Sequence, residues 1–127
     1  MQDKVLYEYA IIRLVPKVER GEFINVGVIL LSKHSNYLAM KCNIDKRKLS
    51  AFSEDIDVDL IKEYLNAWES VCKGGPEGGK IGELEIRVRF RWLTANRSTI
   101  IQSSPVHPGF CDDPEKKLDM LFAQFVL

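Results

Sequence analysis

Two polar side chains interrupt the apolar segments at the start of the chain, where they have the chemistry of a binding site. Arg13 stands within a run of Ile, Leu and Val, and Asn25 stands within the apolar segment 23–31. A buried polar group without a partner costs about 1–3 kcal/mol, so each side chain must pair with another polar group or serve a site. A hairpin that turns around residues 20–21 places Arg13 opposite Asn25 on one face. Gly27, without a side chain, leaves room beside them for a ligand or a second backbone.

Further polar side chains follow in the last third of the chain. Together with Arg13 and Asn25 they can line one polar pocket that binds a small molecule or serves an enzyme. A purely structural contact between Arg13 and Glu22 or Glu8 explains the same residues, so both interpretations stay open. The candidate binding residues are Arg13, Asn25, Arg97, Ser98, Gln102, Ser104 and His107.

His107 and Cys111 lie four residues apart in a proline-containing segment. A cysteine beside a histidine base is the arrangement of a nucleophilic enzyme, and both side chains also ligate metals. A zinc site usually draws on a second ligand pair, and His34 with Cys42 is a poor one. We therefore assign no catalytic residue, expect neither a metal nor a cofactor, and interpret His107 as a side chain that bonds a backbone carbonyl.

The segment Gly74–Lys80 has the spacing G-x-x-x-x-G-K, which begins a phosphate-binding P-loop. That site requires a strand before the loop, a helix after it, and Ser or Thr after the lysine to reach Mg²⁺. Here a helical pattern precedes the loop and Ile81 follows the lysine. We interpret the segment as a surface loop.

Four arginines between Arg87 and Arg97 are interleaved with Phe90 and Trp92. Arginines can hold phosphates while aromatic rings stack on bases, so binding of RNA or single-stranded DNA is an alternative function. The 127-residue chain has 18 Lys and Arg against 18 Asp and Glu, and a net charge of zero gives no long-range attraction for nucleic acid. We favour an amphipathic element whose charged side faces solvent.

Composition describes a single folded domain over residues 1–127. Apolar residues make up 46% and charged residues 28%, the balance of a globular protein. Three widely spaced cysteines form no disulfide framework and fit a reducing compartment. The chain start lacks the pattern of a signal peptide, and no apolar run approaches the length of a membrane span. These features predict a cytoplasmic protein without membrane contact.

Short connections between three apolar segments predict an antiparallel meander. Segments 5–15 and 23–31 are rich in β-branched and apolar residues, segment 37–42 alternates, and 23–31 is apolar on both faces, as a central strand would be. The expected fold class is α+β. It consists of an antiparallel sheet of three to four strands, from the meander 5–42 and a later strand near 98–102, packed with two or three helices.

Residues 57–73 carry the clearest helical pattern in the chain. Asp57 supplies an N-cap, and the two glycines at positions 74 and 75 end the helix. Apolar residues recur at helical spacing on one side, which should face the sheet. This expected buried stripe is Ile61, Tyr64, Leu65, Trp68, Val71 and Cys72.

The remaining segments are expected to be helices and loops. Segment 46–52 predicts one or two helical turns, and segment 103–111 predicts a loop. A last helix is expected to begin here, because Asp113 is a residue type preferred at an N-cap and Pro114 one preferred at the first helical position. Segment 83–92 is ambiguous, because its strict alternation predicts a strand while its apolar residues also line one helical face.

Three stretches of this sequence resemble the domain-of-unknown-function family 3037, and together they cover nearly the whole chain. The resemblance implies bacterial origin, and a gene often adjacent to one for a HipA-like serine/threonine kinase. It also implies a helix at 83–91, and the one departure is Asn96, where the family often has Pro. The stretches are Y-x-Y-A-I-I-R-L-V-P-x-V-E-R-G-E-F-I-N-V-G-V-I-L at 7–30, R-F-R-W-L-T-A-N-R-S-T-I-I-Q-S-S-P-V-H-P-G at 89–109 and D-D-P-E-K-K-L-D-M-L-F at 112–122.

The function expected from these observations is that of an accessory or regulatory protein that binds a HipA-like kinase through protein–protein interaction. The sequence contains no complete catalytic constellation and therefore favours a protein that is not an enzyme. Two alternatives remain: a small-molecule-binding protein or enzyme with a polar pocket around Arg13, Asn25 and His107, and nucleic-acid binding through Arg87–Arg97. The sequence does not determine the oligomeric state.

Overall fold

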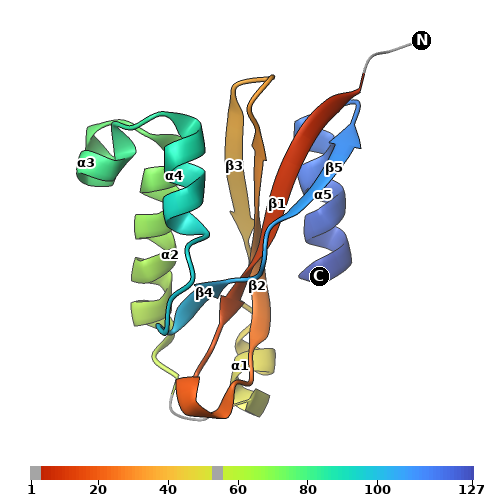
Figure 1. The fold of residues 1–127 in the computed structure, drawn as a ribbon. Helices are drawn as coiled ribbons and strands as arrows, with labels where there is room; N and C mark the ends of the chain where they lie inside the picture. Colours follow the sequence, from red (N-terminus) through yellow and green to blue (C-terminus); the bar gives the residue numbers. More distant parts are fainter. Residues whose placement is uncertain (1–3, 53–55) are drawn as a thin grey trace.

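The structure, a computed structural model, describes residues 4–52 and 56–127. Over these residues, five antiparallel strands form one open sheet at the centre of the molecule (Figure 1). β3, β2 and β1 lie in that order, and both β4 and β5 pair with the outer edge of β1. The strands are β1 (Val5–Leu14), β2 (Ile24–Ser32), β3 (Tyr37–Cys42), β4 (Ile101–Ser103) and β5 (His107–Cys111).

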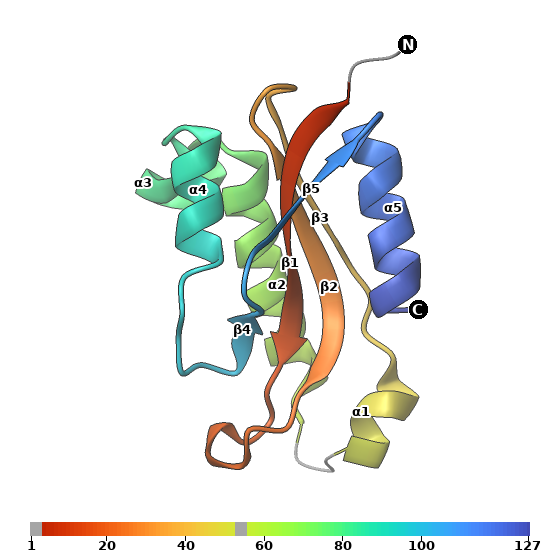
Figure 2. The same cartoon turned by 45° about the vertical axis from the view of Figure 1, so that its right-hand side comes forward.

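Helices cover both faces of the sheet, which gives three layers (Figures 1 and 2). The helices α2 and α4 lie on one side, α5 lies on the other, and α1 lies at the lower end in Figure 1. The α+β class with an antiparallel meander is therefore confirmed. The helical elements are α1 (Lys46–Phe52), α2 (Val58–Lys73), α3 (Gly79–Gly82), α4 (Ile86–Leu93) and α5 (Pro114–Phe125), with 3-10 turns at Val18–Arg20 and Pro76–Gly78.

Each face of the sheet has its own apolar core because side chains alternate along the strands. On the α2 side, Ile12 and Ile29 pack with Leu65 and Trp68. On the α5 side, the buried residues are Tyr7, Ile11, Val28, Leu30, Cys111, Leu118, Leu121 and Val126. The central strand β2 contributes to both cores, as its apolar sequence predicts.

The two long helices begin at the residues that the sequence indicates. The Asp57 carboxylate accepts a hydrogen bond from the Leu60 N–H and caps α2. The Asp113 carboxylate accepts from the N–H groups of Glu115 and Lys116 and caps α5, with Pro114 at its first position. None of the described helices combines the length and apolar character needed to cross a membrane.

Two segments were difficult to predict from the sequence. The helix expected from the family resemblance at 83–91 is confirmed, since α4 begins at Ile86. The loop expected at 103–111 is wrong in its second half, where β5 pairs with the first half of β1. Pro108 is compatible with a strand here because β5 has β1 as a neighbour on one side only, and an edge strand tolerates a residue without an N–H.

Candidate functional site

Three of the predicted site residues form a row across neighbouring strands. Arg13 on β1 lies directly opposite Asn25 on β2 and directly opposite Gln102 on β4. Paired residues share a face, and this is the α5 face, because Ile12 and Leu14 belong to the other core. The prediction that Arg13 and Asn25 lie opposite each other is confirmed.

The two side-chain amides of this row form hydrogen bonds within the protein. Asn25 Nδ2 donates to the Phe125 carbonyl at 3.1 Å and so fastens the end of α5 to the sheet. Gln102 Nε2 donates to the Thr99 carbonyl at 2.7 Å. The Arg13 guanidinium lies 4.1 Å from the centroid of the Phe23 ring, and its buried Nε has no hydrogen-bond partner among the described residues. The row thus has a structural role, with spare donor capacity on Arg13.

Ser104 and His107 lie farther along the same edge of the sheet. Ser104 Oγ accepts from the Ile11 N–H at 2.7 Å and donates to the Pro105 carbonyl at 2.9 Å, which occupies this hydroxyl. The exposed His107 ring has its centroid 5.4 Å from that of Tyr9. These contacts hold β5 and the preceding segment on β1.

The arrangement of His107 and Cys111 does not form a catalytic pair. Both residues belong to β5, and four residues along a strand span about 13 Å, too far for a base to take a proton from a thiol. Cys111 is buried whereas His107 is exposed. Within residues 4–52 and 56–127, no three His, Cys, Asp or Glu side chains come together as metal ligands would.

Arg97 and Ser98 lie apart from the other predicted site residues, on the α2 side of the molecule. The Arg97 guanidinium is 5.6 Å from the centroid of the Trp68 ring and 4.3 Å from that of Trp92, and it donates to the Trp92 carbonyl. Ser98 is exposed beside it. The prediction that all seven residues line one pocket is therefore wrong, because the sheet separates Arg97 from Arg13.

An apolar groove surrounds Arg97. Its volume is about 520 Å³, and large apolar side chains remain accessible in it, with Leu60 39% and Tyr64 43% exposed. The sequence pattern placed Tyr64 in the buried stripe of α2, which is wrong: Tyr64 faces the groove. Burial lowers the pKa of Arg97 from its ordinary value, yet an arginine stays charged at neutral pH. The groove residues are Leu60, Tyr64, Trp68, Arg97, Thr99, Ile100 and Ile101.

The three arginines on α4 differ in their surroundings. Arg89 is 8% exposed, and its guanidinium donates to the backbone carbonyls of Val71, Cys72 and Leu84. Arg87 lies 3.3 Å from the Glu85 carboxylate, and Arg91 is exposed. Alternation in the sequence did not reveal that Arg89 points into the protein, because two of its three carbonyl partners lie at the end of α2.

The space beside Gly27 is filled by the neighbouring strand. A Cβ atom at this position would lie 2.7 Å from both the Lys41 carbonyl oxygen and the Cys42 Sγ. We expect Gly27→Ala to lower the free energy of unfolding by about 1–3 kcal/mol, because the backbone of β3 must move to admit the methyl group. Urea unfolding followed by circular dichroism measures this change.

Gly21→Ala is the matched control for Gly27→Ala. At Gly21 an added Cβ meets no atom within 4 Å, but φ is +73°. An alanine there carries only the strain of a left-handed conformation, about 1 kcal/mol. If Gly27→Ala is no more destabilising than Gly21→Ala, close packing against β3 is not the reason for a glycine at position 27.

Comparison with known proteins identifies the family of this chain. The family model described as "Protein of unknown function (DUF3037)" matches residues 9–126. No curated protein and no solved structure matches the chain. The match extends from β1 to the end of α5 and so includes the polar row and the groove. The chain therefore belongs to the DUF3037 family.

Proposed function

We propose that this protein is a non-enzymatic accessory protein that binds a HipA-like serine/threonine kinase in the bacterial cytoplasm. The observation that carries the proposal is the groove between α2 and segment 97–101, where apolar side chains surround a charged Arg97. The choice of a kinase as the partner rests on the family resemblance. The geometry of the groove supports the more general part of the proposal, namely that the groove binds a segment of another protein.

The residue types in the groove are those that contribute most to protein–protein interfaces. Tyr, Trp and Arg are enriched among the residues that dominate binding energy, because each offers a large apolar surface with a polar end. Tyr64 is accessible, and Trp68 forms part of the wall beneath it. Covering Tyr64 and Leu60 removes apolar surface from water, which stabilises a complex by roughly 25 cal/mol per Å² before the costs of association.

The positive charge of Arg97 determines which kind of partner segment fits the groove. Arg97 is held between two tryptophan rings, and no described carboxylate lies within salt-bridge distance of it. A guanidinium that is already fixed loses little side-chain entropy when a partner binds. The segment that fits is therefore apolar with one Asp or Glu placed to meet Arg97.

The experiment is a titration of the purified full chain with a HipA-like kinase from the same organism, followed by calorimetry. We expect Tyr64→Ala to weaken binding by about 30-fold or more, the effect of losing a central interface residue. Phe110→Ala is the matched control, because Phe110 is an aromatic residue on β5 that is 67% exposed and lies outside the groove. Its affinity should equal that of the unmodified protein.

Two results would contradict the proposal. One is a kinase that does not bind the unmodified protein, and the other is a kinase that binds Tyr64→Ala as tightly as the unmodified protein. Both substituted residues are exposed, so thermal melts of the two variants should coincide with that of the parent protein.

A further inference from the structure

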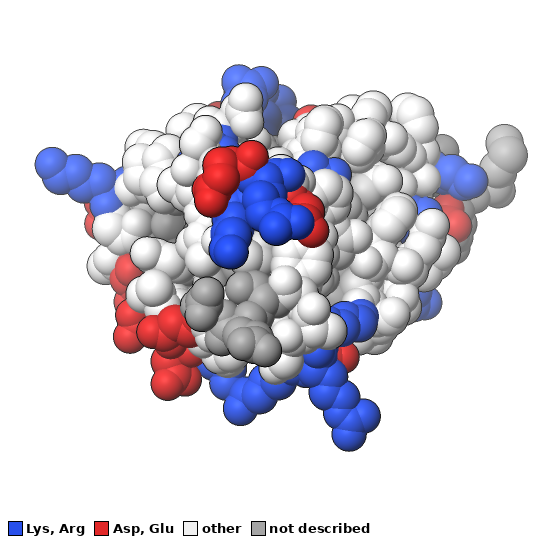
Figure 3. Space-filling model, turned by 90° about the horizontal axis from the view of Figure 1, so that it is seen from below, with Lys and Arg blue, Asp and Glu red and all other residues white. Residues whose placement is uncertain are grey.

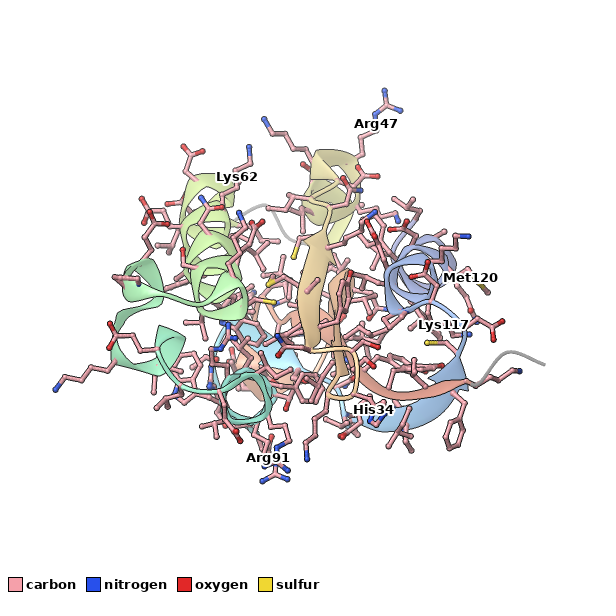
Figure 4. The ribbon with its side chains drawn as sticks, turned by 90° about the horizontal axis from the view of Figure 1, so that it is seen from above. His34, Arg47, Lys62, Arg91, Lys117 and Met120 are labelled. Atoms are coloured by element: carbon pink, nitrogen blue, oxygen red, sulfur yellow. The ribbon has the colours of Figure 1, made fainter. Side chains whose placement is uncertain are left out.

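Basic side chains from three separate elements line one pocket at the upper end of the sheet. The pocket lies between the first residues of β1, the turn that joins β2 to β3, and α4. Figure 4 shows His34 and Arg91 at the same edge of the molecule, with Arg47 and Lys62 at the opposite edge. The basic lining residues are Lys4, Lys33, His34, Arg87 and Arg91.

The positive charge of this pocket is local. Its lining residues include four Lys or Arg side chains against a single acid, Glu8, although the whole chain has a net charge of zero. Arg87 also contacts the Glu85 carboxylate, which lies outside the pocket lining, and exposed pairs of this kind are weak. At the other end of the molecule, seen from below in Figure 3, acidic and basic side chains are interspersed. Like charges brought together repel, and a bound anion would offset this repulsion.

The geometry suits a phosphate group. Arg87 and Arg91 are four residues apart on α4, so their guanidinium groups lie on one side of the helix and can address the same ligand. A guanidinium donates two parallel hydrogen bonds to phosphate oxygens, and Lys33 adds a point charge from the turn. The two arginines come from one helix, which favours a defined site over a diffuse charged surface.

The size of the pocket and its apolar wall indicate the rest of the ligand. The volume of the pocket is about 360 Å³, within the range of small-molecule sites. Leu6 lines the same pocket and is 49% exposed, so it can pack against an organic group attached to the phosphate. We propose that this pocket binds a small phosphomonoester, with Arg87, Arg91 and Lys33 on its phosphate.

This proposal does not depend on the proposed partner function. The phosphate pocket and the apolar groove share no lining residue. A variant in one site should therefore leave binding at the other unchanged, and either proposal can fail alone.

The test titrates the full chain separately with inorganic phosphate, glycerol 3-phosphate and adenosine monophosphate, followed by calorimetry and amide NMR spectra at physiological salt. We expect one saturable site, tighter for a phosphomonoester than for phosphate itself, with shifts at the amides of residues 33–34 and 87–91. Arg91→Ala should weaken binding by about 10-fold, the effect of losing one charged donor. A preference between the two esters identifies the organic group that Leu6 accepts.

The matched control is Arg47→Ala, an arginine on α1 at the opposite edge of the molecule in Figure 4. Its affinity for the phosphomonoester should be unchanged, and Lys33→Ala should repeat the loss seen in Arg91→Ala. The proposal is overturned if no phosphate compound saturates below about 10 mM, or if Arg47→Ala weakens binding as much as Arg91→Ala. It is also overturned if only a single-stranded oligonucleotide binds, with the steep salt dependence of a polyanion.

Discussion

Arg89→Ala is expected to lower the free energy of unfolding by about 3–5 kcal/mol, because three backbone carbonyls lose the donor that satisfies them. The Arg89 guanidinium donates to Val71 at 3.0 Å, to Cys72 at 2.8 Å and to Leu84 at 2.9 Å. Val71 and Cys72 belong to the last turn of α2, where carbonyls have no partner within the helix. Each unsatisfied buried carbonyl costs about 1–3 kcal/mol, and the three costs overlap in part.

Chemical denaturation with urea measures this loss, and two variants serve as controls. Arg91→Ala, on the same helix but exposed, should change the free energy of unfolding by less than about 0.5 kcal/mol. Arg89→Lys keeps the charge but not the planar set of donors, so its stability should lie between those of the parent and Arg89→Ala. Equal stability of Arg89→Ala and Arg91→Ala would show that the buried guanidinium contributes nothing to the fold.

The position of Arg89 also explains a glycine after α2. Gly74 has φ of +84°, and a Cβ atom there would lie 2.5 Å from Arg89 Nη1. The sequence predicts a glycine stop for the helix from local chemistry alone. The second reason for this glycine, which is space for a guanidinium from α4, follows only from how the two helices pack.

Local patterns were enough to predict most of the sheet and the two long helices. The alternation in β3 and the spacing in α2 each reflect neighbours a few residues away, so a single sequence reveals them. The strand β5 was missed because its pairing partner is the start of β1, about a hundred residues earlier along the chain. A Pro-Gly pair predicts a loop unless the edge of a sheet is known to lie beside it.

The residues of the candidate site also differ in whether their contacts are local in the sequence or join distant segments. Arg13 and Asn25 are joined by one short hairpin, so their pairing could be derived from the sequence. Arg97 lies beside Trp68, which belongs to a different element, and nothing in either segment predicts that contact. Tyr64 was placed on the correct side of α2, but helical spacing does not tell how much of that side the sheet covers. The uncovered part is the groove.

Cys42 and Cys72 are expected to react with iodoacetamide at pH 8 about 1000-fold more slowly in the folded protein than in urea. Burial, together with the smaller effect of the nearby Glu69 carboxylate, raises the pKa of the Cys42 thiol from 9.0 to about 12. Burial also raises the pKa of Cys72 to about 12, against a lowering effect from the charge of Arg89. Alkylation requires the thiolate, and a shift of three pH units reduces its fraction at pH 8 by about 1000-fold.

Cys42 tests whether the rate of alkylation depends on the solvent exposure of the sulfur atom or on that of the whole residue. Cys42 as a residue is exposed, but its Sγ lies against Gly27. In the unfolded chain both thiols ionise at lower pH than in the folded one. Their contribution to stability is therefore complete below about pH 9 and is lost as the pH rises towards 12. Peptide mass spectrometry after timed alkylation measures each cysteine separately. If folded Cys42 is alkylated as fast as unfolded Cys42, its sulfur is open to solvent and the packing against Gly27 does not persist in solution.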